Sequence, residues 1–221
     1  MARSSPIKGT LILLVRHGQT PTTGKHLPGR APGLHLSDTG RAQAQGVAER
    51  IAALPTIDAV YASPLERTRE TARPIGAARG VKVQIDKGLT EIDVGDWTGD
   101  ALSVARKRPE WKTLQTWPSG FRFPGGESLA EMQSRVGATL DRLIAKHPGG
   151  VIVVVSHADV IKAAVMAALG THLDLFERVA ISPCSVSAIA YGPGPTAKAG
   201  APAPMVLSVN CLSDLASLVP S

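Results

Sequence analysis

Three nearly continuous apolar runs of strand length constrain the fold of this 221-residue chain more than any other feature. They span residues 10–15, 57–62 and 151–155, and the last of them is the most apolar. Apolar runs with little polar alternation are typical of strands in a parallel sheet, because helices cover both faces of such a sheet. The runs therefore predict a sheet that is buried on both sides.

Segments with helical signals alternate with these strands along the chain. Ser37 or Asp38 is placed to cap the first helix, and Pro55 stops it. Such alternation predicts an α/β fold, a three-layer α/β/α sandwich with a mostly parallel sheet. We expect one domain over residues 1–221. The other predicted elements are helices over 64–78, from Ser128 onwards and over about 159–169, and strands over 81–85, 185–191 and 205–209.

Two segments interrupt this alternation. Residues 96–126 belong to a stretch without clean periodicity, and we expect a lid-like insertion at about this position. Its aromatic side chains either line an apolar substrate site or form a small core that packs the insertion onto the domain, and we favour the core. Residues 192–204 consist of Gly, Pro, Ala, Thr and Lys, which predicts a flexible surface loop. The aromatic residues in question are Trp97, Trp111, Trp117, Phe121 and Phe123.

The composition narrows the class of protein. No stretch approaches the roughly 20 apolar residues of a membrane span. The apolar run 11–15 is too short for the core of a signal peptide. We therefore predict a cytoplasmic protein with no membrane partner. The two cysteines, Cys184 and Cys211, match neither a disulfide framework nor a zinc motif.

The net charge of +6 is compatible with nucleic-acid binding and equally with an anionic small molecule. Lys and Arg are scattered through the helical segments, the aromatic content is 4%, and no recognised nucleic-acid motif occurs. We predict no nucleic-acid partner and a positive cleft that concentrates phosphate compounds. The sequence indicates no oligomeric state.

Side chains suited to catalysis follow four of the predicted strands. Arg16 and His17 come directly after the first strand, and Arg67 lies in the first turn of the helix after the second. Glu91 follows the third strand, and His157 follows the fourth at a helix N-terminus, whose free N–H groups attract anions. Ligands of open α/β sheets bind beyond the carboxyl ends of the strands. Each residue alone has a structural explanation, but the five together predict one site.

This set of side chains fits phosphoryl transfer through a covalent intermediate. The neutral imidazole of His17 attacks phosphorus in line, and Arg16 and Arg67 hold the equatorial oxygens with their planar forks. His157 donates a further hydrogen bond to these oxygens. Glu91, kept protonated, gives its proton to the leaving alkoxide and later deprotonates the attacking water. The sequence offers no metal cluster and no P-loop, zinc-protease or serine-hydrolase motif, so we predict no metal and no cofactor.

Five sequence motifs cover the chain from about residue 10 to residue 190. They are VRHGQT at 15–20, SPLERT at 63–68, EIDVGDWTG at 91–99, PGGES at 124–128 and SH at 156–157. In this order they resemble the motifs of the histidine phosphatase superfamily, which has the phosphoglycerate mutase-like fold. The resemblance implies that His17 is the phosphorylated nucleophile and Glu91 the proton donor. It also implies that Arg16, Arg67 and His157 form the phosphate pocket.

Two departures from the family pattern concern substrate binding. The family often has Asn six residues beyond the nucleophile, where this chain has Thr23, whose hydroxyl replaces one hydrogen bond to phosphate. Ala158 and Asp159 stand where the family often has two glycines. We expect the backbone N–H of Ala158 to donate to phosphate. Asp159 places a carboxylate near the mouth of the pocket, which disfavours highly anionic substrates.

The resembled family contains both hydrolases and cofactor-dependent mutases. The mutases have a Glu-Arg-His-Tyr-Gly block where residues 91–95 read EIDVG, and paired arginines whose spacing Arg106 and Arg108 do not match. We therefore predict a phosphatase that acts on a small-molecule phosphomonoester, with a phosphoglycerate mutase-type phosphomutase as the alternative. A non-enzymatic phospholigand-binding protein is disfavoured, because neither the nucleophile nor an arginine is lost.

Overall fold

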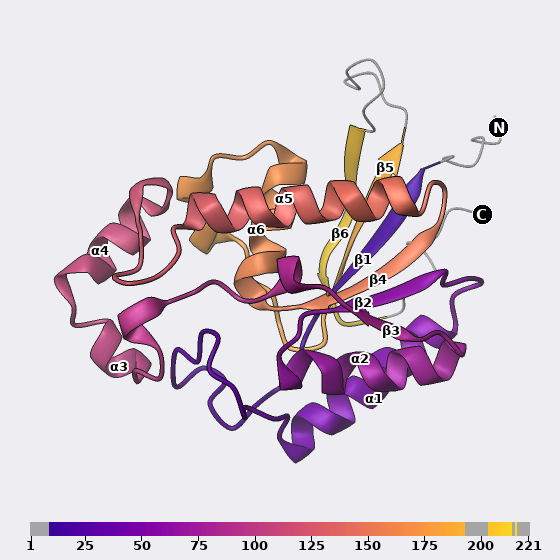
Figure 1. Cartoon of the computed structure of the whole chain (residues 1–221), viewed down its shortest axis with the longest axis horizontal. Coiled ribbons are helices and arrows are strands. Elements are labelled where there is room, and N and C mark those ends of the chain that lie inside the picture. The colour runs from indigo at the N-terminus through magenta and orange to yellow at the C-terminus, as the bar shows by residue number, and fades with distance from the viewer. Residues whose placement is uncertain (1–8, 193–202, 214, 216–221) are drawn as a thin grey trace.

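A computed structural model of the chain describes residues 9–192, 203–213 and 215. Six strands form one sheet in the order β3-β2-β4-β1-β5-β6, and helices cover both of its faces (Figure 1). This confirms the predicted three-layer α/β/α arrangement. The strands are β1 (Thr10–Arg16), β2 (Ala59–Ala62), β3 (Val83–Ile85), β4 (Val151–Ser156), β5 (Val186–Gly192) and β6 (Ala203–Cys211).

The helices form the two outer layers. Helices α1 and α2 cover one face of the sheet, and α5 and α6 cover the other (Figure 1). Successive residues of β1 alternate between the two cores, so that Leu13 packs with α1 and α2 whereas Leu14 packs with α5 and α6. Both faces are apolar, which explains why β1 and β4 lack polar alternation. The helices are α1 (Asp38–Ala52), α2 (Glu66–Arg79), α3 (Leu102–Ala105), α4 (Pro109–Thr116), α5 (Leu129–Lys146) and α6 (Ala158–Leu169), with short 3-10 turns η1 (Lys87–Leu89), η2 (Gly95–Trp97), η3 (Pro118–Gly120) and η4 (Leu173–Arg178).

None of the helices in the described part of the chain has the length and apolar content that a membrane crossing requires. Helix α5 is the longest of them, and it is amphipathic, with one apolar face on the core. Its first turn carries a capping box, in which Ser128 accepts from the N–H of Glu131 and the Glu131 side chain accepts from the N–H of Ser128. This cap explains why the helix begins directly after Ser128, as the sequence predicts.

The sheet is parallel in one half and antiparallel in the other. The pairs β2–β3, β2–β4 and β1–β4 are parallel, whereas β5 pairs antiparallel with both β1 and β6. The chain between β5 and β6, residues 193–202, is shorter than the dozen or so residues that a parallel crossover needs. The four strands that precede the predicted site residues, β1 to β4, all belong to the parallel half.

Some element boundaries differ from those that the sequence predicts. Strand β2 begins at Ala59 and β3 at Val83, because the pairing with a neighbouring strand starts at these residues. The loop predicted over 192–204 is too long at both ends, since Gly192 and Ala203 face each other in the β5–β6 ladder. The remainder of that loop, 193–202, lies outside the described residues.

The aromatic residues of the segment 96–126 form a small core. Trp97 is fully buried, stacks on Trp111 with ring centroids 6.1 Å apart, and makes an edge contact with Phe123 at 5.3 Å. Phe121 packs against both Trp97 and Phe123. The interpretation as a packing core is therefore confirmed for these four residues, whereas the Trp117 side chain is 57% exposed.

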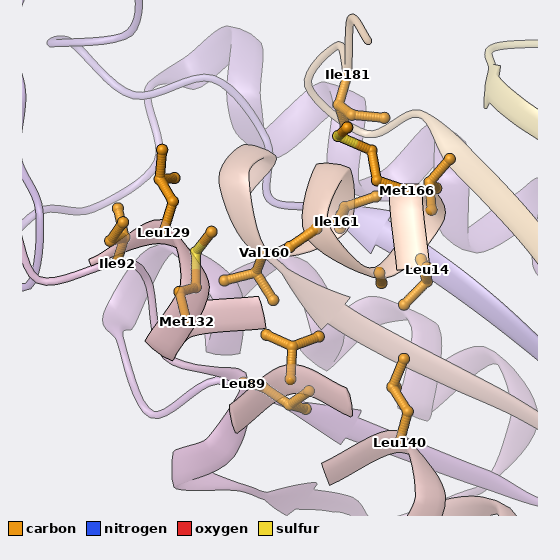
Figure 2. Close-up of a cluster of buried hydrophobic side chains, with 14 of the residues drawn as sticks. Leu14, Leu89, Ile92, Leu129, Met132, Leu140, Val160, Ile161, Met166 and Ile181 are labelled. Carbon is orange, nitrogen blue, oxygen red and sulfur yellow. The ribbon is translucent and has the colours of Figure 1, made fainter. Parts of the chain in front are cut away.

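The core under α5 and α6 holds the segment that contains Glu91. Its neighbours Leu89 and Ile92 are buried in the same cluster as Leu129 and Met132 of α5 (Figure 2). Burying side chains of this size contributes roughly 1.5–3 kcal/mol each. The backbone of Glu91 is therefore anchored on both sides by apolar packing.

Two glycines allow the loop after β1 to pass directly against the start of α1. A Cβ atom on Gly40 would overlap the carbonyl oxygen of Gln19, and one on Gly18 would overlap the carbonyl oxygen of Gly40. Ser37, which caps α1, donates both its backbone N–H and its hydroxyl to the carbonyl of Gln19. This close contact fixes the backbone that follows His17.

We predict that Gly40→Ala lowers the free energy of unfolding by about 1–3 kcal/mol, because the added methyl group forces the two segments apart. Gly46→Ala in the same helix is the matched control. A Cβ there has no neighbour within 4 Å. That change should instead stabilise the protein by about 0.5–1 kcal/mol. Urea denaturation of both variants checks this, and equal effects would contradict the packing described.

Candidate active site

The parallel register of the sheet brings the predicted site residues together. Arg16 of β1 pairs with Ser156 of β4, so His17 and His157 are the next residues on two neighbouring strands. The backbone N–H of His17 donates to the carbonyl of Ser156 over 2.9 Å, and the two imidazole rings meet edge to face with centroids 5.3 Å apart. In the same way Ser63, which follows β2, donates its N–H to Val155 and lies beside His157.

A cavity of about 250 Å³ opens at this edge of the sheet. Arg16, His17, Arg67 and Glu91 line it, and the fully buried His157 does not line it but contacts the ring of His17. The structure therefore brings together all five residues that the sequence predicts for one site. A larger cavity of about 510 Å³ between α2 and β3 contains none of them.

His17 is held as a neutral imidazole with one defined tautomer. Its Nδ1 lies 2.7 Å from the carbonyl oxygen of Gly18, which can only accept, so Nδ1 carries the proton and Nε2 carries a free lone pair. Burial, together with the charges of Arg67 and Arg16, lowers the pKa of His17 to about 3. An unprotonated ring nitrogen at neutral pH is what a nucleophilic histidine requires.

Arg16 and Arg67 present hydrogen-bond donors that no group in the described part of the chain accepts. Arg16 donates from Nη1 to the carbonyl of Ile181, and Arg67 donates from Nη2 to the carbonyl of Gly29. The Nε atoms of both residues and Nη1 of Arg67 are buried without a partner among the described residues. Burial lowers the pKa of each guanidinium, and Glu91 opposes this change. Buried, unpaired cations are costly, and a bound phosphate would satisfy them.

His157 has one engaged and one free ring nitrogen. Its Nε2 shares a hydrogen bond of 2.8 Å with the hydroxyl of Ser63, and its Nδ1 is buried without a hydrogen-bond partner. Burial, followed by the charges of Arg67 and His17, holds the pKa of His157 well below its ordinary value. The nearest carboxylate oxygen to Nδ1, Oε2 of Glu91, lies 3.8 Å away.

Glu91 is a buried carboxyl group with a raised pKa. Burial is the largest cause and the negative charge of Asp159 the next, and they raise the pKa to about 7 against the opposing effect of Arg67. One oxygen, Oε1, accepts from the backbone N–H of Ile92 at 3.0 Å. A carboxyl group with this pKa carries a proton in a large fraction of molecules near neutral pH, as a general acid must.

Thr23 and Ala158, the two further residues predicted to bind substrate, also line the cavity. The Thr23 hydroxyl accepts from the N–H of Thr20 at 2.8 Å and lies 3.0 Å from the Thr20 hydroxyl, so the loop already uses part of its capacity. Ala158 is the first residue of α6, where backbone N–H groups point toward the cavity end of the helix. Among the described residues, no group of three His, Cys, Asp or Glu side chains is arranged to hold a metal ion.

Three residues that the sequence analysis missed hold Glu91 in place. Glu127 accepts two hydrogen bonds from Arg135, at 2.9 Å each, and one from Arg30, also at 2.9 Å. Arg30 in turn donates to the carbonyl of Glu91 at 2.7 Å, and Arg135 donates to the carbonyl of Thr90 at 2.9 Å. The PGGES motif marks Glu127 in the sequence, but nothing there pairs it with Arg30 and Arg135. We call these three residues the Glu127 clamp.

Known proteins that are similar to this chain in sequence and in fold identify its family. Residues 12–199 match the family model of the histidine phosphatase superfamily, branch 1. Phosphoglycerate mutase-like protein 4 of Arabidopsis thaliana is 39% identical over 69% of this chain and 68% of its own. Phosphoserine phosphatase 1 of Hydrogenobacter thermophilus is 35% identical over 75% of this chain and 79% of its own. The solved structure of mycobacterial hydrolase 2, 24% identical, superposes with a TM-score of 0.84 over 95% of this chain and 94% of that one.

The chain therefore belongs to the histidine phosphatase superfamily, and it is a phosphatase. The structural match extends over nearly the whole chain and shows the same fold. The resemblance carried by the five sequence motifs is thus confirmed.

We predict that Glu127→Gln destabilises the protein by about 2 kcal/mol, because two arginines lose the carboxylate that pairs them. It should also lower kcat on an alkyl phosphate, since the backbone of Glu91 loses an anchor. Chemical denaturation and steady-state kinetics measure the two effects. Glu49→Gln, on the exposed face of α1, is the control and should change neither. Equal behaviour of the two variants would contradict the role of the clamp.

Proposed function

We propose that this protein hydrolyses small-molecule phosphomonoesters through a phosphohistidine intermediate on His17, with no metal ion or other cofactor. The observation that carries the proposal is the neutral His17 ring, with Nε2 free, beside guanidinium groups that have unpartnered N–H donors. Nucleophile and anion-binding groups thus meet in one cavity.

In the first step Nε2 of His17 attacks phosphorus, and the bond between phosphorus and the ester oxygen breaks. The N–H groups of Arg16 and Arg67 stabilise the charge on the remaining phosphoryl oxygens, and Nδ1 of His157 is placed as a further donor when protonated. The carbonyl of Gly18 stabilises the positive imidazole ring that forms. Glu91 gives its proton to the departing alkoxide.

In the second step a water molecule attacks the phosphohistidine. The Glu91 carboxylate takes one proton of this water, the bond between phosphorus and Nε2 breaks, and inorganic phosphate leaves. The electron pair returns to Nε2 and Glu91 is again protonated, so the cycle closes without any further reactant. Burial of Glu91 makes both roles accessible near neutral pH.

Hydrolysis is favoured over the mutase alternative by the position of the two arginines of the insertion. Arg108 forms an ion pair with Asp100 at 2.7 Å and lies 5.4 Å from the centre of the Trp97 ring. Neither Arg106 nor Arg108 lines the cavity. A paired-arginine site for a second anionic group of the substrate is therefore not formed by these residues.

We predict that His17→Ala reduces hydrolysis of p-nitrophenyl phosphate by about 10³-fold or more, since the nucleophile is removed. The wild type should keep its activity in EDTA. It should also retain labelled phosphate on the protein after an alkaline quench, and His17→Ala should retain none. His172→Ala, at an exposed histidine outside the cavity, is the control. Undiminished activity of His17→Ala would rule out the mechanism.

The pKa of Glu91 predicts the pH dependence for alkyl phosphates. Glu91 loses its proton as the pH rises through about 7, so kcat/KM should fall about tenfold per pH unit above that value. His17, with a pKa of about 3, stays neutral at all higher pH values and contributes no acidic limb above about pH 4. With p-nitrophenyl phosphate, whose leaving group needs no proton, the alkaline limb should be weak. An equally steep alkaline fall for both esters would contradict the assignment of Glu91 as the proton donor.

A further inference from the structure

The lining of the cavity contains two cationic side chains, Arg16 and Arg67. Arg16 and Arg67 are the only Lys or Arg side chains among the described residues that line it. A phosphate dianion balances the charges of these two residues. Any other anionic group of the substrate would therefore enter the cavity with no cation to receive it, which is unfavourable for a charge that leaves water.

The rest of the cavity is where the alcohol part of the ester must lie. Its walls come from the loop after β1, from the segment after Glu91 and from the insertion. Apart from the exposed imidazole of His26, they are apolar or carry neutral hydroxyl groups. The residues concerned are Thr20, Thr22, Leu27, Ile92, Val94 and Leu102.

Asp159 adds a carboxylate to the lining of the cavity. It is the second residue of α6, its side chain is 37% exposed, and it lines the cavity beside Ala158. Its negative charge acts on groups inside the site, because it raises the pKa of Glu91 and that of Arg16. The carboxylate is thus electrostatically coupled to the proton donor and to the phosphate pocket.

Lys162 partly neutralises the carboxylate of Asp159, but its own ammonium group does not line the cavity. Its Nζ lies 3.7 Å from Oδ1 of Asp159 but 3.4 Å from Oε2 of Glu177, and it stands 4.7 Å from the centre of the Phe176 ring. These contacts hold the ammonium group toward η4, and Lys162 is not among the residues that line the cavity. Because Lys162 is shared between two carboxylates, Asp159 keeps negative charge to offer to a ligand.

We infer that this cavity selects phosphomonoesters whose alcohol part carries no second anionic group, and that Asp159 gives preference to an alcohol with an ammonium group. The inference rests on the proposed function, since it concerns the alcohol part of the same ester. An ammonium group gains a carboxylate partner there, a hydroxyl group finds neutral walls, and a carboxylate is repelled.

Three small esters test the inference. They are 2-aminoethyl phosphate, 2-hydroxyethyl phosphate and 3-phosphonooxypropanoate (the carboxylate ester), in which the same two-carbon chain carries an ammonium, hydroxyl or carboxylate group; phosphoglycolate, one methylene shorter, is a second carboxylate ester. Each is measured as a competitive inhibitor of p-nitrophenyl phosphate hydrolysis at about pH 7.5, where the phosphate is largely dianionic. Because each ester can also be hydrolysed, its inhibition constant Ki equals its KM. The leaving groups are the same for the wild type and a variant, so the comparison of Ki ratios between them isolates the effect of the substitution.

In the wild type we expect Ki to rise from the ammonium ester through the hydroxyl ester to the carboxylate ester. Asp159→Asn should reduce the ratio of Ki for the carboxylate ester to Ki for 2-aminoethyl phosphate by about tenfold, the effect of one partly screened charge at close range. Asp159→Glu, which keeps the charge, should keep most of the ratio. Asp38→Asn removes a carboxylate from the first turn of α1, outside the cavity, and should leave the ratio as in the wild type.

Two results would overturn the inference while the proposed function stands. One is a wild type that hydrolyses p-nitrophenyl phosphate through His17 yet binds the carboxylate ester as tightly as 2-aminoethyl phosphate. The other is a ratio that Asp159→Asn leaves unchanged while its melting temperature shows that it is folded. A wild type that does not hydrolyse p-nitrophenyl phosphate, or hydrolyses it equally well as His17→Ala, contradicts the proposed function itself.

Discussion

The parallel pairing of β1 with β4 is the constraint on which the site depends. Because Arg16 lies opposite Ser156, the next residue of each strand is a histidine, and the two rings leave the sheet side by side. A shift of this register by one residue would turn every side chain of the strand to the other face. Both faces are apolar, so it is the close packing of differently shaped side chains in the two cores that opposes such a shift. The geometry of the site therefore depends on the packing of the core.

The electrostatics of the site follow from burying two arginines beside these rings. The cations and the loss of solvent act in the same direction on His17 and His157, and both stay neutral. For Glu91 the two effects oppose each other, and burial is the larger. The same environment therefore yields a free imidazole and a protonated carboxyl group, which phosphoryl transfer through histidine requires together.

The environment of Glu91 depends on parts of the chain that lie far apart in sequence. Leu89 and Ile92 anchor its backbone in the core below α5, and the Glu127 clamp binds the carbonyls of Thr90 and Glu91. Arg30 belongs to the loop after β1, whereas Glu127 precedes α5. The pKa of Glu91 depends on burial, so its surroundings must be rigid. The packing of Leu89 and Ile92 and the Glu127 clamp provide this rigidity, because Glu91 itself lies in neither a helix nor a strand.

Much of the fold and of the site could be predicted because strands and strand ends leave local signals. The runs in β1 and β4 and the cap at Ser128 are readable in sequence, and Arg16, His17 and His157 stand next to them. The clamp could not be predicted in this way. Arg30 and Arg135 act through backbone carbonyls, and an arginine that binds a distant carbonyl has the same local pattern as one that faces solvent. The strands over 185–191 and 205–209 could be predicted, but their antiparallel pairing could not, because an apolar strand does not reveal its direction.

The sequence by itself determined the α/β class, the family and the identity of the five residues that meet at the candidate site. These depend on apolar periodicity and on short motifs, which are local properties of the chain. The tertiary structure decided the tautomer of His17, the raised pKa of Glu91 and the presence of the Asp159 carboxylate in the lining of the cavity. The physical reason is that burial and electrostatic interaction depend on distances in space between residues such as Glu91 and Asp159, which the order of residues does not contain.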